Sequence, residues 1–178
     1  MLYLARTDEP EIQRETLACL CSLSFAEENK VNIAKYGGLP AIAGAIRSPH
    51  SDTARMACCA CANLCEVVEN MDRVVDANVI PALVLALSCG ERHVSREAAR
   101  ALGNLCANLE YGDLVLRAGA LPSLMVLLRA EDQGVQRMAA MALCNLSTNI
   151  RWMSKLSSHL CLNCHLCALS SGTVCVIV

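Results

Sequence analysis

Residues 119–146 read GALPSLMVLLRAEDQGVQRMAAMALCNL, and the rest of the 178-residue chain is organised around copies of this stretch. Its landmarks are a Gly, a Pro three residues later, an Arg and a closing Asn-Leu pair. The Pro recurs every 41 residues, at Pro40, Pro81 and Pro122, and the other landmarks follow with little change. A fixed period in the forties with helical patterning indicates a stacked helical solenoid, in which each unit packs only against its neighbours.

The landmarks divide the chain into repeat units. We expect a partial unit at 1–37, full units at 38–78 and 79–119, a partial or degenerate unit at 120–150, and an atypical tail at 151–178 that is uncharged from residue 156 onward. Leu2 to Arg6 align with the second half of a helix in the later units. We therefore expect the chain to be an excerpt from a longer protein.

Each full unit is predicted to contain a short, a medium and a long helix. The predicted long helices span about 11–25, 53–65, 94–107 and 135–148, the medium ones 40–47, 81–88 and 122–129, and the first short one 28–35. Asp8 is the expected N-cap of the first long helix. One column before the medium helices holds Gly37, Asn78 and Gly119. Gly and Asn adopt positive φ most readily, so this column predicts a helix end and a sharp turn.

Composition limits the function and the compartment. The formal net charge is −2 and the chain has one Phe, one Trp and three Tyr, so neither a basic field nor a set of stacking platforms for nucleic acid is present. The thirteen Cys are interpreted as small buried hydrophobes in a reducing compartment, because the first residues do not resemble a secretory signal. We expect a cytoplasmic protein, with the nucleus as the alternative.

No constellation of residues predicts catalysis, a metal site or a cofactor. Acidic residues such as Glu66, Asp72 and Asp113 are expected on solvated faces. In the tail, Cys161 to His165 has the spacing of a haem attachment, and with Cys167 that of a zinc site, but nothing completes either. The last four residues from Cys175 fit a prenylation pattern, and the uncharged run from residue 156 is long enough for a membrane span but rich in polar residues.

Three helices per unit, a Gly-x-x-Pro start and a closing Ala-x-x-Ala-Leu-x-Asn-Leu resemble the armadillo repeat family, over about residues 2–150. HEAT repeats have two helices per unit and usually lack this Asn. The resemblance implies an all-α, right-handed solenoid of three-helix repeats. It also implies a concave groove, lined by the third helices, that binds an extended segment of a partner protein.

In that family the Asn near the end of the third helix commonly bonds the backbone of a bound peptide. The resemblance assigns this role to Asn63, Asn104 and Asn145, while the matching Ser22 departs from the pattern. The chemistry agrees, because an amide side chain can donate and accept at once, as an extended backbone does. The alternative is that each Asn braces a neighbouring helix.

An Arg column lies two helical turns before the Asn column. Its members are Arg14, Arg55, Arg96 and Arg137, and Arg100 adds to it one turn later. Stacked helices lie about 8–10 Å apart, so these side chains are predicted to form a ladder that favours a partner with acidic residues. The alternative is that they pair with neighbours such as Glu15 and Glu97 or simply solvate the start of the helix.

Import receptors of the importin-α type, which bind nuclear signals, usually carry Trp one turn before the Asn. Cys59, Arg100 and Met141 occupy those places here, so we do not expect binding of basic nuclear signals. The favoured function is a non-enzymatic protein-binding scaffold or adaptor. The alternative is a membrane-tethered armadillo adaptor lipidated at Cys175, and self-association through the uncapped ends is expected in either interpretation.

Overall fold

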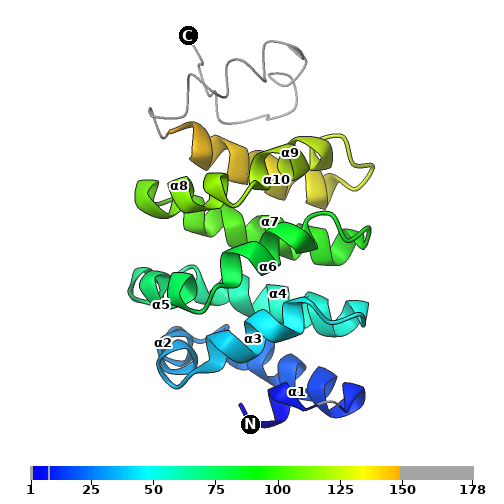
Figure 1. Cartoon of the computed structure of the whole chain (residues 1–178), viewed down its shortest axis with the longest axis vertical. Helices are drawn as coiled ribbons and strands as arrows, with labels where there is room; N and C mark the ends of the chain where they lie inside the picture. The colour runs from blue at the N-terminus through cyan, green and yellow to red at the C-terminus, as the bar shows by residue number, and fades with distance from the viewer. Residues whose placement is uncertain (1, 8, 149–178) are drawn as a thin grey trace.

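The computed structural model describes residues 2–7 and 9–148, and it shows a stack of helices with the N-terminal ones at one end (Figure 1). No strand occurs among the residues described. The elements in order are η1 (Leu4–Arg6), α1 (Pro10–Leu23), α2 (Glu27–Lys35), α3 (Gly38–Ile46), α4 (Ser51–Leu64), η2 (Val68–Asn70), α5 (Met71–Asp76), α6 (Val79–Ala86), α7 (Arg92–Cys106), α8 (Leu109–Arg117), α9 (Ala120–Leu127) and α10 (Gln133–Ser147). The predicted all-α solenoid is confirmed.

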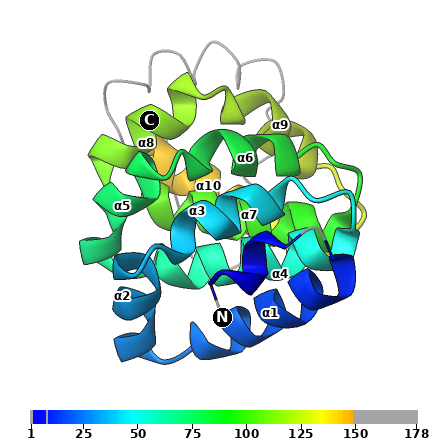
Figure 2. The ribbon, with the colours of Figure 1, turned by 60° about the horizontal axis from the view of Figure 1, so that its bottom comes forward.

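Three kinds of helix recur along the stack. The third helices α1, α4, α7 and α10 pack consecutively against one another, and the second helices α3, α6 and α9 each pack against the third helix that follows. The first helices α2, α5 and α8 gather along one side of the stack (Figure 2). The short helix before Asn78 is divided into η2 and α5.

The second helices begin two residues earlier than predicted, so their Pro stands in the first turn and not at its first position. α3 begins at Gly38 and α6 at Val79, ahead of Pro40 and Pro81. The first N–H groups of a helix have no partner within it, and a Pro without N–H is therefore tolerated there. Asp8, the predicted cap of α1, lies outside the described residues, and Glu9 occupies the N-cap position without a side-chain bond.

The turn between first and second helices has the predicted backbone geometry. The φ angles are 86° at Gly37, 53° at Asn78 and 86° at Gly119. Asn78 is the only described residue other than Gly with positive φ. The prediction from the column is confirmed, and the same left-handed residue ends one helix and precedes the next.

The cysteine prediction is confirmed for part of the set. Nine described Cys are free thiols, and Cys58, Cys61, Cys65 and Cys106 lie fully in the core between the helices. Cys19, Cys89 and Cys144, in contrast, are exposed. Burial raises the pKa of Cys58, and it raises that of Cys106 to about 12, so these two core thiols stay protonated.

The tail predictions cannot be placed on the fold. Cys161, His165, Cys167 and Cys175 lie outside the described residues, as does the uncharged run from residue 156. Within the part of the chain that is described, no helix is both long enough and apolar enough to cross a bilayer.

Candidate functional site

The predicted site residues lie on the third helices. Positions four and eight residues apart share one side of a helix, so Arg96, Arg100 and Asn104 follow one another along α7. The corresponding positions on α4 are Arg55 and Asn63. We call the side of α1, α4, α7 and α10 that carries these columns the third-helix face.

The Asn column braces the stack. Asn104 Nδ2 donates to the carbonyl oxygen of Ala62 at 2.9 Å, and Asn145 Nδ2 donates to that of Gly103, also at 2.9 Å. Each bond therefore joins one third helix to the preceding one. Both side chains are half-buried, and no described residue donates to their Oδ1 atoms. Contact of these Asn with a partner stays a prediction.

Asn63 is placed differently, since only 2% of it is exposed. Its Nδ2 donates to Ser24 Oγ at 2.9 Å, and its Oδ1 accepts from Arg100 Nη2 at 2.9 Å. Ser24 in turn donates to the carbonyl oxygen of Cys21 at 2.6 Å. Both groups of the Asn63 amide are thus used inside the protein, which is the bracing alternative, and a bond to a partner would have to displace one of them.

The Arg column is paired to different degrees along the stack. Arg14 Nη2 lies 2.7 Å from Glu15 Oε1, and Arg96 Nη2 lies 3.1 Å from Glu97 Oε1. These two pairs are the ones that the alternative interpretation expects. Arg55 makes only a long contact, 3.8 Å from its Nε to Asp52 Oδ1. Arg137 is exposed and has no ion pair with any described residue.

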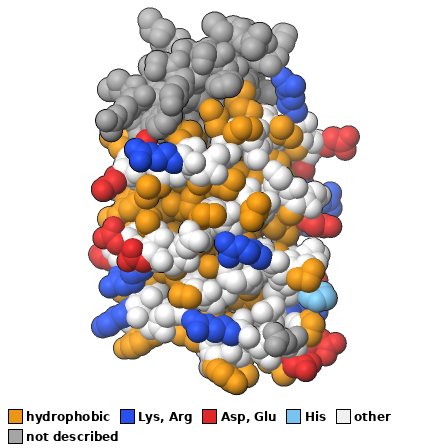
Figure 3. Space-filling view, in the orientation of Figure 1, with side chains coloured by type: hydrophobic (Ala, Val, Ile, Leu, Met, Phe, Trp, Pro, Cys, Tyr) orange, Lys and Arg blue, Asp and Glu red, His pale blue; other side chains and the backbone are white. Residues whose placement is uncertain are grey.

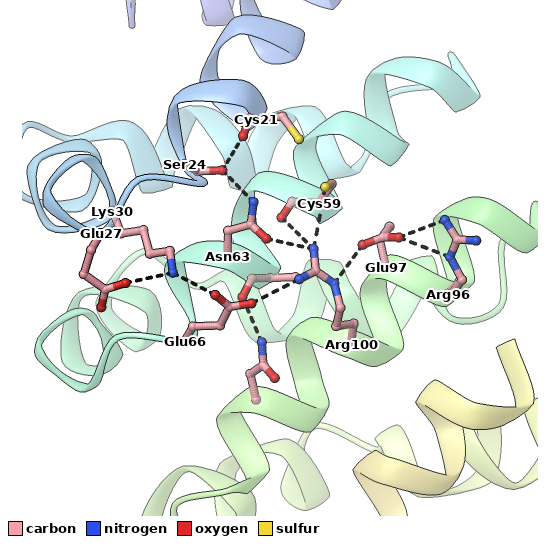
Figure 4. A network of polar contacts seen from close by, with 12 residues as sticks. Cys21, Ser24, Glu27, Lys30, Cys59, Asn63, Glu66, Arg96, Glu97 and Arg100 are labelled. Carbon is pink, nitrogen blue, oxygen red and sulfur yellow. Dashed lines mark hydrogen bonds and ion pairs between the residues drawn. The ribbon is translucent and has the colours of Figure 1, made fainter. Parts of the chain in front are cut away.

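Arg100 is the centre of a polar network that joins three third helices (Figure 4). Its Nε donates to Glu97 Oε2 at 2.9 Å and its Nη1 to Glu66 Oε1 at 3.2 Å. Its Nη2 reaches back to α4, to the carbonyl oxygen of Cys59 at 3.3 Å and to Asn63. Burial is the largest single influence on Arg100 and opposes the charged form, but Glu97, Cys59 and Glu66 together outweigh it and the pKa of Arg100 is raised. Arg100 is therefore a permanent, half-buried cation.

Glu66 is exposed, as expected, but it is not a lone acid. It bridges Arg100 and Lys30, whose Nζ lies 2.8 Å from Glu66 Oε2. Lys30 is buried, also contacts Glu27 at 3.2 Å, and has its pKa raised chiefly by the Glu66 bond. The other two acids are also partnered: Asp72 accepts from Tyr111 and Asp113 pairs with Arg117.

Among the described residues, two neighbouring clefts are found where second helices turn into third helices. The larger, about 930 Å³, lies between the α6–α7 and α9–α10 turns, and the smaller, about 530 Å³, lies one repeat earlier. Leu85 lines the smaller cleft and Val126 the larger, 41 residues apart in sequence, and both are exposed. Hydrophobic side chains are spread over the middle of the surface in Figure 3, with acidic ones toward its edges. None of the predicted site residues lines either cleft.

Comparison with known proteins defines the class. The family model for the armadillo/β-catenin-like repeat matches residues 68–107 and 113–148. An engineered protein of known crystal structure is similar to the chain with 31% identity and a TM-score of 0.78, covering 81% of this chain and 61% of that one. The chain therefore spans about three-fifths of the length of that protein. Comparison with curated protein sequences gave no match.

Two designed armadillo repeat proteins share the fold. One has 22% identity and a TM-score of 0.83 over 88% of this chain and 68% of its own. The other was solved in complex with the peptide (KR)4 and has 20% identity and a TM-score of 0.80, over 93% of this chain and 73% of its own. The molecule is thus an α-solenoid of three-helix repeats. Its fold is that of the armadillo repeat proteins, and the armadillo repeat model matches two of its units.

Proposed function

We propose that this armadillo protein is a non-enzymatic scaffold that binds an extended, acidic segment of a partner protein along the third-helix face. The observation that carries the proposal is the row formed by Arg55, Arg96 and Arg137. These side chains recur at the repeat spacing and stay accessible to solvent, with 34% of the Arg55 side chain and 38% of the Arg96 side chain exposed, and Arg137, which is exposed, has no described counterion.

The spacing of the row suits an extended chain. Stacked helices lie about 8–10 Å apart, and an extended chain advances about 3.3 Å per residue, so one Arg meets about every third residue of the ligand. An Arg guanidinium binds a carboxylate through two parallel hydrogen bonds, which gives direction as well as charge attraction. We therefore expect ligands with Asp or Glu at about that spacing.

The Asn column supports the same placement of the ligand, along the third-helix face. Asn104 and Asn145 use Nδ2 to hold the preceding helix and keep Oδ1 free of described donors. An amide oxygen in that position accepts from a backbone N–H of an extended segment. In this proposal the Asn side chains act as acceptors, and the Arg side chains select the charge.

The test is reversal of the row. The triple variant Arg55→Glu, Arg96→Glu, Arg137→Glu should lose at least about tenfold in affinity for an acid-rich extended peptide, equivalent to about 1.4 kcal/mol. The binding should weaken with added salt, because exposed charges are screened. Fluorescence anisotropy with a labelled peptide measures both effects, and circular dichroism checks that helicity is kept.

The matched control carries the same charge change away from the third-helix face: Arg73→Glu, Arg117→Glu, Arg129→Glu. Arg73 lies on α5, Arg117 on α8 and Arg129 just after α9. Equal loss in both triple variants would mean that only net charge matters. Tight binding of a (Lys-Arg)4 peptide, with weak binding of the acidic one, would reject the acidic ligand.

The membrane-tethered alternative rests on Cys175, which lies outside the described residues. Detergent partitioning of the chain against its Cys175→Ser variant tests it. Equal partitioning of the two forms would leave the scaffold without a lipid anchor at this residue.

A further inference from the structure

Cys59 is set apart from the other described thiols by what surrounds its sulfur. It lies half-buried on α4, and Arg100 Nη2 donates to its Sγ at 3.6 Å. A guanidinium beside a thiol favours the thiolate, which is the nucleophilic form of cysteine. The core thiols of Cys58 and Cys106 are buried with no cation bonded to them.

A second thiol lies opposite, on the neighbouring third helix. Cys21 of α1 lies opposite Cys59, and Figure 4 shows the two sulfur atoms close together. The repeat gives independent support, because Met141 and Gly103 occupy the corresponding pair of positions two units later. There the Met141 Cε lies 2.6 Å from where a Gly103 Cβ would stand. Side chains in the Cys59 column therefore point at the position that Cys21 occupies.

The ionisation of the pair is uneven. The neighbouring Cys21 thiol is the largest influence on Cys59 and lowers its pKa to about 7, with Arg100 acting the same way and burial and Glu97 opposing. The neighbouring Cys59 thiol, together with burial, raises the pKa of Cys21. Near neutral pH Cys59 is thus the thiol of the pair that ionises, whereas Cys21 stays protonated.

We propose that Cys59 and Cys21 are a redox-active pair, in which Cys59 reacts with hydrogen peroxide and Cys21 then closes a disulfide between α1 and α4. The proposal is independent of any partner on the third-helix face. It adds a modification site at the junction of the first two third helices.

The chemistry proceeds in two balanced steps. The Cys59 thiolate attacks one peroxide oxygen, the O–O bond breaks, an S–O bond forms, and the departing hydroxide takes a proton to become water. Cys21 then attacks the sulfenic sulfur, the S–O bond breaks, and the hydroxide leaves as water with the proton of Cys21. Hydrogen peroxide accepts the two electrons that the thiols lose. A cellular thiol reductant converts the disulfide back to two thiols.

The first experiment measures reactivity. Each cysteine of the whole chain is labelled at a low concentration of iodoacetamide between pH 5 and 9 and quantified by mass spectrometry. Cys59 should be labelled with a midpoint near pH 7 and ahead of the exposed Cys19 and Cys89, since thiolate character outweighs exposure. Arg100→Gln should move the midpoint upward. Arg55→Gln should not, because Arg55 lies on the same helix as Cys59 but makes no bond to it.

The second experiment looks for the bond itself. After peroxide treatment and trypsin digestion without reduction, peptides 15–30 and 56–73 should be found joined, lighter than their sum by two hydrogen atoms. Peptide 15–30 contains both Cys19 and Cys21, so Cys19→Ser is the matched control that keeps the cross-link, while Cys21→Ser and Cys59→Ser abolish it.

Three results would overturn the proposal. One is labelling of Cys19 and Cys89 before Cys59 in the wild-type chain, which needs no variant to fold. Another is a cross-link that survives in Cys21→Ser but disappears in Cys19→Ser. The third is a disulfide formed within peptide 56–73 in place of the cross-link, where the Cys61 and Cys65 sulfurs lie 3.9 Å apart.

Discussion

The Asn column shows how one residue type takes two roles at equivalent positions. Asn104 and Asn145 donate to a backbone carbonyl of the preceding third helix, and Asn63 instead donates to Ser24 Oγ. The difference follows from Ser24, because its hydroxyl donates to the Cys21 carbonyl oxygen, which corresponds to the Ala62 and Gly103 carbonyls, and its own oxygen accepts from Asn63. Equivalent places in a repeat thus depend on the side chains of the neighbouring unit.

We predict that Asn63→Ala is more destabilising than Asn104→Ala. The first removes one buried and one partly buried hydrogen bond and leaves Arg100 short of an acceptor, for which we expect a loss of roughly 1–3 kcal/mol. The second removes one half-exposed bond, worth about 1 kcal/mol. Urea unfolding followed by circular dichroism measures both, and an equal loss would contradict the assigned bonding of Asn63.

The sequence predicted the columns but not the network that joins them. Asn63, Arg96 and Arg100 were identified from the period, whereas the Lys30–Glu66–Arg100 bridge was missed. A signal was present, because Lys30 stands in a column that otherwise holds Met71 and the buried Gly112. A charge in a buried column requires a counterion, but the counterion comes from another unit, and spacing alone does not identify it.

At the scale of the element, the turn before each second helix depends on a left-handed residue. Gly119 has φ 86° with open space where a Cβ would stand, so the penalty for a side chain is conformational and not steric. The sequence predicted these turns because one column, read across units, is restricted to Gly and Asn. It missed the helix starts by two residues, because Pro is accepted throughout the first turn and does not mark its first position.

Two Gly→Ala substitutions should have opposite signs. Gly119→Ala forces an alanine into the left-handed region and should destabilise by roughly 1–2 kcal/mol. Gly44→Ala lies within α3, exposed and with nothing within 4 Å of the added Cβ, and should stabilise by roughly 0.5–1 kcal/mol. Thermal or urea unfolding of the two variants gives the signs, and destabilisation by both would reject the conformational argument.

The start of α10 should respond to acid. Asp132 Oδ1 accepts from the Val135 N–H at 3.0 Å, and this bond is the main cause of the lowered pKa of Asp132. A lowered folded-state pKa means that the stabilisation is present above about pH 4 and is lost as the pH falls through the folded value. The protection factors of the amide hydrogens at the first turn of α10, which correct for the slower intrinsic exchange in acid, should fall at low pH.

Asp132→Asn provides the comparison for that measurement. An Asn side chain still caps the helix through its oxygen but does not titrate. The variant should keep protection at neutral pH and lose the dependence on acid at this helix start. An unchanged acid response would assign the effect to other carboxylates.

At the scale of the whole molecule, the period determines the architecture because each unit buries its apolar columns against its neighbours. The closing Leu column is fully buried at Leu64, Leu105 and Leu146, with 0% exposed at each. The sequence predicts such stacking from the period alone. The period does not predict which apolar surfaces stay exposed, because this depends on how the assembled helices cover one another.

In the first unit, residues of two columns that are buried later in the stack are exposed. Leu23 is 41% exposed and Ile12 is 45% exposed, whereas Val94 and Val135 in the Ile12 column are each 2% exposed. An apolar surface that neighbouring units cover elsewhere in the stack favours contact with a like surface on a second copy. We therefore predict that the chain self-associates through the α1 end as its concentration rises.

Lysine at these two positions should weaken that association. The double variant Ile12→Lys, Leu23→Lys places charges where a second copy would bury apolar area, and we expect at least about a tenfold weaker association. Sedimentation velocity over a range of concentrations measures it. Leu64→Lys in the covered column should instead unfold the stack, because a lone charge there has no partner. Association that is unaffected by the α1 variant would place the contact on another surface, such as the clefts beside Leu85 and Val126.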